Sequence, residues 1–511
     1  MLNKINLLSI TIPLLFMFLF SIQNARAVIN YTLEWNYTYN SSTFNEEAND
    51  VAVDSQRNII VVGYNSSTTS ETSWNITKLY ENGTYMWNYT FESGISGSDD
   101  RAVSVAVDPL DDSFVVAGYN RNTSSTRDYE WRIMKFDSTN NKQWEVVYNI
   151  TLLIDQPTRV AIDHESNIIV VGFYRASSIT TTDYGWFILK LNNNGGQIWN
   201  KTFNFSNYDD RPSSVAVDND NNITVVGYDM ALGNNHRQWK IVKLDKNNNT
   251  LWMYNESFSP YNDRIYDVAV DNNNNIIAVG VEWSQGQYNS QWRVMKFKPD
   301  KNETLWNYPK DISTTADAAF GVSIDSFNNI TVVGYFNASY TANDPDWLII
   351  RLGGSDNAPL WNYTTHLSDW GDQPRSVAID NKDDIVVVGS DSPSEGNLQW
   401  RVMKFKSIRC GNGRVESPYE DCDISDWGTC QAWEDCDTST CQCYSLLPQT
   451  GGCTFFDNCA SDPCTWWTLG GGGNCYVENA DNDYKNLLLT DPTLCSDPFV
   501  SPHSSRTNCG V

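Results

Sequence analysis

The chain has 511 residues and a formal net charge of -27, with 62 Asp and Glu residues against 35 Lys and Arg residues. This balance argues against a general basic surface that grips nucleic acid or an anionic membrane. All 12 cysteines lie between Cys410 and Cys509, so a long cysteine-free region precedes a short cysteine-rich tail.

Residues 1–27 have the form of a secretory signal peptide. Lys4 supplies positive charge, residues 7–22 are apolar, and Ala25-Arg26-Ala27 has the small-x-small form of a cleavage site. The apolar run is shorter than the roughly 18 to 20 residues that cross a bilayer, and a retained N-terminal anchor is the alternative. We expect a mature chain from Val28 that is secreted or held at the cell surface, with no membrane span after cleavage.

A repeat follows. Each copy reads Val-Ala-Val-Asp, a polar turn, Ile-Val-Val-Gly-Tyr, a variable loop, Trp-x-Ile-x-Lys-Phe, a second turn and Trp-Asn-Tyr-Thr, with local variations. Each copy holds four short runs of β-strand character and none with helical periodicity. Four antiparallel strands at this period predict one propeller blade. The copies are located by an Asp that recurs every 53 to 55 residues, at Asp54, Asp108, Asp163, Asp218, Asp271, Asp325 and Asp380.

The seventh copy stops after Lys404-Phe405, and the segment that it lacks stands ahead of the first copy, at residues 35–38. A closed ring explains this displacement, because an N-terminal strand can complete the last blade and protect its open edge. We therefore predict an all-β, seven-bladed propeller over residues 28–408. Its composite blade would combine residues 31–40 with residues 373–406.

Residues 31–406 resemble the repeats of seven-bladed β-propellers in secreted bacterial and archaeal proteins. In those repeats an Ala-Val-Asp strand precedes a short turn and an apolar strand that ends in Thr-Gly or Val-Gly, as in Val-Ala-Val-Asp and Ile-Val-Val-Gly here. The resemblance implies a propeller and an exported location. It implies no reaction, because that family has no common catalytic motif.

A carboxylate stands eight residues before each repeat Asp, in loops that otherwise vary. One interpretation is that each accepts backbone N–H bonds and holds a blade-to-blade turn. The other is an acidic ring at the channel mouth that binds a cation or a cationic ligand, with calcium as the best candidate ion and no other cofactor expected. The seven residues are Glu46, Asp100, Asp155, Asp210, Asp263, Asp317 and Asp372.

The long loops between the second and third strands should emerge on the same face as this ring. They carry Tyr among Ser, Thr, Asn and Gly, a mixture that suits recognition of carbohydrate or extracellular protein. Enzyme signatures are thin: no Gly-x-Ser-x-Gly turn and no metal-ligand His spacing occurs. A catalytic site should break the sevenfold symmetry, and the best polar residues that do so are Asp128, Glu130, Asp183, His236, Glu282 and Asp346.

The tail divides into a cysteine-rich module at residues 409–444 and a second segment at residues 445–511. Cys410-Gly411-Asn412-Gly413 and Cys441-Gln442-Cys443 resemble the opening and the close of the myxobacterial-type cysteine-rich repeat. This resemblance implies a small extracellular disulfide module. Zinc is the alternative, disfavoured by the absence of Cys-x-x-Cys pairs. The sequence does not show which cysteines pair with one another. The cysteines expected to form disulfides are Cys410, Cys422, Cys430, Cys436, Cys441, Cys443, Cys453, Cys459, Cys464, Cys475, Cys495 and Cys509.

Before Cys410 the chain contains 18 Asn-x-Ser/Thr triplets, such as those at Asn36, Asn75 and Asn362, and the signal peptide makes glycan occupancy at several of them an expectation. The first functional hypothesis is a secreted, glycosylated recognition or adhesion module that binds carbohydrate or protein, without enzyme activity. The alternatives are a secreted polysaccharide hydrolase or lyase and a structural component of the cell envelope.

Overall fold

The structure, a computed structural model, describes the repeat region and parts of the tail. The described residues are 29–40, 44–68, 71–121, 128–151, 153–176, 183–230, 236–283, 289–337, 345–394 and 397–409, with the backbone of four tail strands. These strands are β29 (Glu434–Asp437), β30 (Gln442–Ser445), β31 (Trp467–Gly470) and β32 (Asn474–Val477). No helix long and apolar enough to cross a membrane occurs in these ranges. The predicted signal peptide and cysteine side chains lie outside them.

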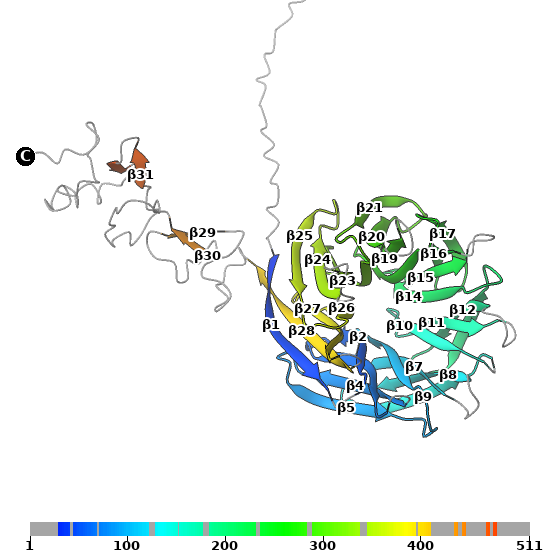
Figure 1. Cartoon of the computed structure of the whole chain (residues 1–511). Coiled ribbons are helices and arrows are strands. Elements are labelled where there is room, and N and C mark those ends of the chain that lie inside the picture. The colour runs from blue at the N-terminus through cyan, green and yellow to red at the C-terminus, as the bar shows by residue number, and fades with distance from the viewer. Residues whose placement is uncertain are drawn as a thin grey trace, which may run out of the picture. The chain divides into compact units, whose positions relative to one another are not determined.

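Seven four-stranded sheets are arranged in a ring (Figure 1). In every blade the strand that ends before a repeat Asp lies innermost, next to the equivalent strands of the neighbouring blades. Blades 1 to 3 are β2 (Glu47–Val53), β3 (Ile59–Ser66), β4 (Thr72–Leu79), β5 (Tyr85–Phe91); β6 (Arg101–Val107), β7 (Phe114–Arg121), β8 (Tyr129–Phe136), β9 (Lys142–Tyr148); and β10 (Gln156–Ile162), β11 (Ile168–Arg175), β12 (Tyr184–Leu191), β13 (Gln197–Phe203).

The other blades have the same arrangement, and all are given from the inner strand outward. In the composite blade 7 the outer strand is the first strand of the chain. Blades 4 to 7 are β14 (Arg211–Val217), β15 (Ile223–Met230), β16 (Arg237–Leu244), β17 (Thr250–Glu256); β18 (Arg264–Val270), β19 (Ile276–Trp283), β20 (Ser290–Phe297), β21 (Thr304–Lys310); β22 (Ala318–Ile324), β23 (Ile330–Asn337), β24 (Pro345–Leu352), β25 (Pro359–Thr365); and β26 (Gln373–Ile379), β27 (Ile385–Ser394), β28 (Asn397–Arg409), β1 (Ile29–Tyr39).

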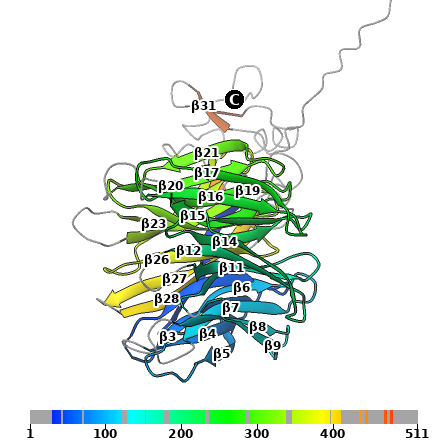
Figure 2. The same ribbon diagram turned by 90° about the vertical axis from the view of Figure 1, so that its right-hand side faces the viewer.

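Blade 7 confirms the predicted closure by the N-terminal strand. Its sheet order is β26-β27-β28-β1, so the displaced segment is the outer strand of the last blade. In Figures 1 and 2 the yellow strands β27 and β28 lie beside the blue strands of blade 1. Trp400 of β28 packs with Ala48 and Val51 of β2, and its indole Nε1 donates to the Tyr64 carbonyl oxygen at 3.1 Å. The ring is thus closed by apolar packing and hydrogen bonds.

The turn after each inner strand explains why the repeat ends in Asp. Asp218 Oδ1 accepts the backbone N–H of Asp220 at 3.0 Å and of Asn222 at 2.8 Å, while Asn221 takes a positive φ of 63°. Asn tolerates this left-handed conformation better than most residues. The second oxygen pairs with Lys243 of the third strand at 2.8 Å. The fixed Trp-to-Lys spacing in the repeat therefore positions a buried cation for the turn carboxylate.

Two constant residues fit the crowded packing between strands and blades. A Cβ on the Gly that follows Val-Val would lie 1.9 Å from the Glu47 carbonyl oxygen at Gly63 and 2.2 Å from that of Gln156 at Gly172, so only glycine fits. The third-strand Trp is 0–1% exposed in all seven blades. Trp74, for example, packs with Ala102 and Val105 of the next blade. The seven copies are Trp74, Trp131, Trp186, Trp239, Trp292, Trp347 and Trp400.

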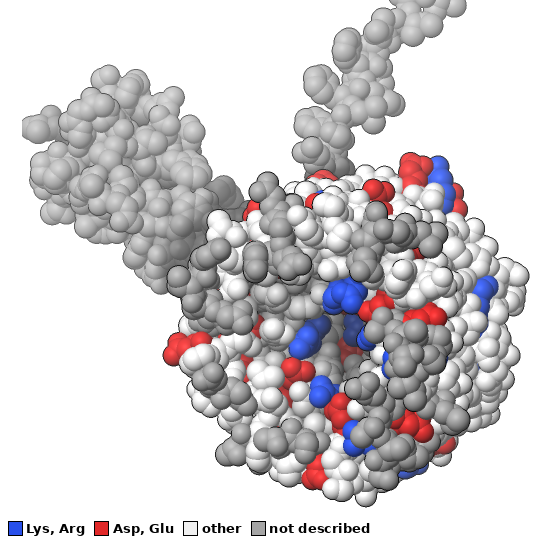
Figure 3. Space-filling view, turned by 45° about the vertical axis from the view of Figure 1, so that its right-hand side comes forward, with Lys and Arg blue, Asp and Glu red and all other residues white. Residues whose placement is uncertain are grey.

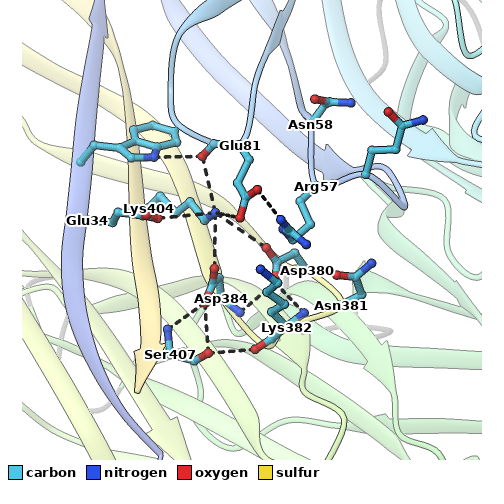
Figure 4. Close-up of polar contacts among 12 residues, drawn as sticks. Glu34, Arg57, Asn58, Glu81, Asp380, Asn381, Lys382, Asp384, Lys404 and Ser407 are labelled. Carbon is cyan, nitrogen blue, oxygen red and sulfur yellow. Dashed lines mark hydrogen bonds and ion pairs between the residues drawn. The ribbon is translucent and has the colours of Figure 1, made fainter. Parts of the chain in front are cut away.

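A cluster of charges marks the junction of blades 7 and 1. Lys404 of β28 is 1% exposed and lies within ion-pair distance of four carboxylates (Figure 4). The distances from Nζ are 3.3 Å to Asp384, 3.5 Å to Glu34 of β1, 3.6 Å to Glu81 and 3.8 Å to Asp380. Arg57 also pairs with Glu81. We call Lys404 and its four carboxylates the closure cluster.

Candidate functional site

The seven loop carboxylates are all 0% exposed. Asp210 is typical: it accepts the N–H groups of Phe205 at 2.8 Å, Ser206 at 2.7 Å and Met230 at 3.0 Å, and the Ser206 hydroxyl at 2.7 Å. Asp100, Asp263, Asp317 and Asp372 accept equivalent sets. These contacts correspond to the turn-holding interpretation of the ring.

Burial raises the pKa of five of these carboxyl groups. It raises the pKa of Asp155 and of Asp372 to about 6, although hydrogen bonds from the neighbouring loop oppose the shift. Burial also raises the pKa of Asp210, Asp263 and Asp317. Among the described residues no group of three or more His, Cys, Asp or Glu side chains has an arrangement that could hold a metal ion. Calcium binding stays a prediction.

The residues that break the symmetry are spread over blades 2 to 6, and only Asp128 and Glu130 share a blade. Glu130 contacts Asn120 and Arg132 of blade 2, and Glu282 contacts Gln291 and Arg293 of blade 5. Asp346 pairs with His366 at 2.8 Å in blade 6. Asp183 accepts a 3.4 Å bond from Asn204, His236 lies edge-on to Tyr261, and Asp128 is 8% exposed.

An ion triad that the sequence did not predict connects three inner strands across the ring. Arg159 of β10 donates to Asp50 of β2 and to Asp267 of β18, at 2.7 Å in both cases. Ser104 and Ser376 also donate to Asp50, at 2.7 and 2.6 Å, and Ser214 donates to Asp267 at 2.6 Å. All of these residues stand four places before a repeat Asp. We call Arg159, Asp50 and Asp267 the floor.

The residue five places before each repeat Asp stands next to the floor position in the chain and differs between the blades. We call the end of the ring that these residues line the mouth. Blades 1 to 4 carry Asn49, Val103, Thr158 and Ser213 there, whereas blades 5 to 7 carry Tyr266, Phe320 and Arg375. The Tyr266 and Phe320 rings are 4.8 Å apart, and the Arg375 guanidinium lies 5.7 Å from the Phe320 ring. One side of the mouth is therefore aromatic and half-buried, and the other is lined by small residues.

Three inner strands, β6, β14 and β18, begin with an arginine. We call these residues, Arg101, Arg211 and Arg264, the rim arginines. Each lies over an aromatic ring of the preceding blade: Tyr64 at 4.2 Å, Phe173 at 4.3 Å and Tyr228 at 5.5 Å, respectively. These distances are those of cation–π contacts. Figure 3 shows Lys and Arg side chains around the hollow of the propeller, with Asp and Glu among them.

The densest group of cations surrounds Tyr228. Arg211, Arg237 and Arg264 all lie near this ring, and Arg211 and Arg237 share the carboxylate of Asp209 at 2.5 and 2.8 Å. Burial pushes the pKa of Asp209 up, but the two arginines outweigh it and hold that pKa below its usual value. Within the described part of the chain, Arg264 has no ion-pair partner. We call Arg211, Arg237 and Arg264 the arginine cluster.

Two exposed aromatic residues lie in loops that lead into the inner strands. Trp370 is 47% exposed and Tyr208 is 46% exposed, and both stand ten places before a repeat Asp. The loop before an inner strand is at the same end of the blade as the rim arginines. The mouth thus combines guanidinium groups with flat apolar surfaces, as ligand pockets commonly do.

Comparison with known proteins identifies no family. No protein family and no curated protein matches the chain. Solved structures that are similar to it include the β-propeller domain of the Trilobed protease from Pyrococcus furiosus, at 10% identity over 74% of this chain and 96% of that one, with a TM-score of 0.41. A protein of unknown function from Dyadobacter fermentans shares 10% identity over 75% and 100%, with a TM-score of 0.44. A polysaccharide lyase, the PL25 ulvan lyase, shares 11% identity over 71% and 95%, with a TM-score of 0.44.

Proposed function

We propose that the protein is an extracellular recognition module that binds an acidic carbohydrate at the mouth of the propeller. The observation that carries the proposal is the arginine cluster, where Arg211 and Arg237 share the carboxylate of Asp209 and Arg264 has no ion-pair partner among the described residues. A guanidinium binds a carboxylate or sulfate group through two parallel hydrogen bonds. A uronate or sulfated sugar supplies that partner.

The aromatic lining supports a sugar as the rest of the ligand. Tyr266 stands two residues after Arg264 on β18, at the bulge in its pairing with β19, and its ring packs against Phe320 of the next blade. Half-buried aromatic faces next to arginines can take the apolar face of a sugar ring while the guanidinium groups take its acid. Because the floor connects inner strands across the ring, the ligand rests on the mouth and does not thread the ring.

Calorimetry with the full chain tests the proposal. The probes are oligogalacturonate and its fully methyl-esterified form, which differ only in the charge of the carboxyl groups. We expect oligogalacturonate to bind, the ester not to bind, and binding to weaken as salt rises, since the contact is between exposed charges. Arg264→Gln should weaken binding at least tenfold, whereas Lys301→Gln, which removes a fully exposed cation, should leave it unchanged.

Three results would contradict the proposal. Equal binding of the acid and the ester removes the role of charge, and unchanged binding by Arg264→Gln removes the role of the cluster. Tight binding of poly-glutamate with none of oligogalacturonate assigns the mouth to an acidic protein partner. The same incubations also test the enzyme alternative, because appearance of shortened or unsaturated products would identify a hydrolase or lyase.

The extracellular location is a separate part of the proposal. It rests on the charge, apolar run and small-x-small motif of residues 1–27. N-terminal sequencing of the native protein should read from Val28, and the protein should be recovered from the medium or the cell envelope. A chain that retains Met1 and stays in the cell contradicts this part alone.

A further inference from the structure

Four outer strands carry the triplet Asn-x-Thr at the same register. Asn36, Asn88, Asn200 and Asn362 each follow the outer-strand Trp directly, on β1, β5, β13 and β25. All four Asn residues and the Thr two places after each are exposed, whereas the Trp before each is partly buried. Side chains alternate along a strand, so Asn and Thr lie together on the solvent side and Trp packs against the next blade.

The amide nitrogen distinguishes these triplets from three others in the same repeats. In the described part of the chain, the Nδ2 atoms of the four outer-strand residues donate no hydrogen bond. By contrast, Asn222 Nδ2 donates to Asp218 at 3.0 Å and Asn329 Nδ2 donates to Asp325 at 3.0 Å, which holds the turn after the inner strand. Asn75 is 0% exposed and donates to Asn65 at 3.1 Å.

We propose that Asn36, Asn88, Asn200 and Asn362 carry N-linked glycans in the native protein, and that Asn75, Asn222 and Asn329 do not. Glycosylation joins Nδ2 to the anomeric carbon of a saccharide, breaks the bond from that carbon to the phosphate of a glycosyl diphosphate donor, and releases one Nδ2 proton. The outer strands place the new bond in solvent. At Asn222, Asn329 and Asn75 a bulky group on Nδ2 would displace a hydrogen bond that the blade needs.

The position on the outermost strand gives the glycans a physical role. An outer strand has one unpaired edge, which is a template for pairing with another chain unless something blocks it. Ile198 is 47% exposed and Leu360 is 40% exposed, and each stands two residues before a proposed site on the same side of its strand. A saccharide on Asn200 or Asn362 covers that apolar side chain and keeps a second molecule away from the edge.

Glycopeptide mass spectrometry on the protein purified from its native host tests the proposal. We expect saccharide mass on the peptides that contain the four outer-strand sites and none on those that contain Asn75, Asn222 or Asn329. A matched pair of variants made in the same host isolates one site. Thr202→Ala destroys the triplet of Asn200 and should remove one glycan from the intact mass, whereas Thr202→Ser preserves the triplet and should retain it.

Because Thr202 is exposed, neither substitution should affect folding. The proposal is overturned if the four outer-strand sites are bare, if any of the three hydrogen-bonded sites is occupied, or if Thr202→Ala leaves the mass unchanged. It rests on export of the chain and not on the ligand of the mouth. A protein that is glycosylated but binds no acidic sugar therefore contradicts only the proposed function.

Discussion

Substitution of Lys404 by Met should destabilise the propeller strongly and in a pH-dependent way. The side chains of Lys404 and Asp380 are both 1% exposed and that of Asp384 is 4% exposed, so the variant leaves two carboxylates buried without their cation. Removing one partner of a buried ion pair typically costs about 3–5 kcal/mol. Glu34 and Glu81 add further repulsion, which places Lys404→Met at or above the upper end of that range at pH 7.

Lys243→Met is the matched control. Lys243 is equally buried at the equivalent position of blade 4, but it pairs with Asp218 alone, at 2.8 Å. Urea unfolding followed by tryptophan fluorescence should therefore rank the free energies of unfolding as wild type, then Lys243→Met, then Lys404→Met. The double variant Lys404→Met/Asp384→Asn, which removes one of the surplus charges, should recover part of the loss.

The pH dependence supplies an independent check. Burial, and next the charge of Asp384, raises the pKa of Asp380 even with Lys404 present. A carboxyl group whose folded pKa is raised contributes stability that is present below its unfolded pKa and lost as pH rises through the folded pKa. Without Lys404 the rise is larger, so the defect should shrink between pH 7 and pH 5. A Lys404→Met protein that unfolds like Lys243→Met at both pH values refutes the role of the closure cluster.

Three further predictions concern the ring. Arg159→Met should lower the free energy of unfolding in urea by about 3–5 kcal/mol, because Asp50 and Asp267 lose their cation. Adding Asp50→Asn and Asp267→Asn to this variant should restore part of the loss. An Arg159→Met protein as stable as wild type contradicts the role of the floor. Burial raises the pKa of Asp372 to about 6, so ionisation of this carboxyl group should destabilise the folded protein as the pH rises from 4 to 7. The melting temperature of wild type minus that of Asp372→Asn should therefore decrease over this range. A difference that stays constant contradicts the prediction. Deleting residues 29–39 should lower the melting temperature, and a synthetic peptide of that sequence should raise it again; a truncated protein that melts normally refutes closure by β1.

The closure of the ring was predictable because it left a trace in the order of the residues. The segment Trp-Asn-Tyr-Thr at residues 35–38 is missing from the seventh copy, and the blade order β26-β27-β28-β1 confirms the prediction. The Asp at the end of each inner strand marked the repeat in the sequence, and Asp218 accepts the backbone N–H groups of the turn that follows it. These features depend on neighbours in the chain, which is why a single sequence shows them.

The mouth was missed because its members belong to different copies. The positions of Tyr266, Phe320 and Arg375 become visible only when the seven copies are aligned at the fifth place before the repeat Asp, where the first four copies have small residues. This difference between the copies can be seen in the sequence alone. The pairing of Arg159 with Asp50 and Asp267 cannot, because these residues are more than 100 positions apart and face one another only across a closed ring.

The floor also constrains how the repeats can be inherited. Tandem copies of similar sequence gain and lose units by unequal recombination, and a propeller of interchangeable blades would tolerate such events. Arg159, Asp50 and Asp267 come from blades 3, 1 and 5, so the triad forms only when these blades occupy fixed places around one axis. Loss or duplication of a single copy would leave two acids or a lone guanidinium inside the ring. A change in the number or order of blades 1 to 5 would therefore separate Arg159 from Asp50 or from Asp267.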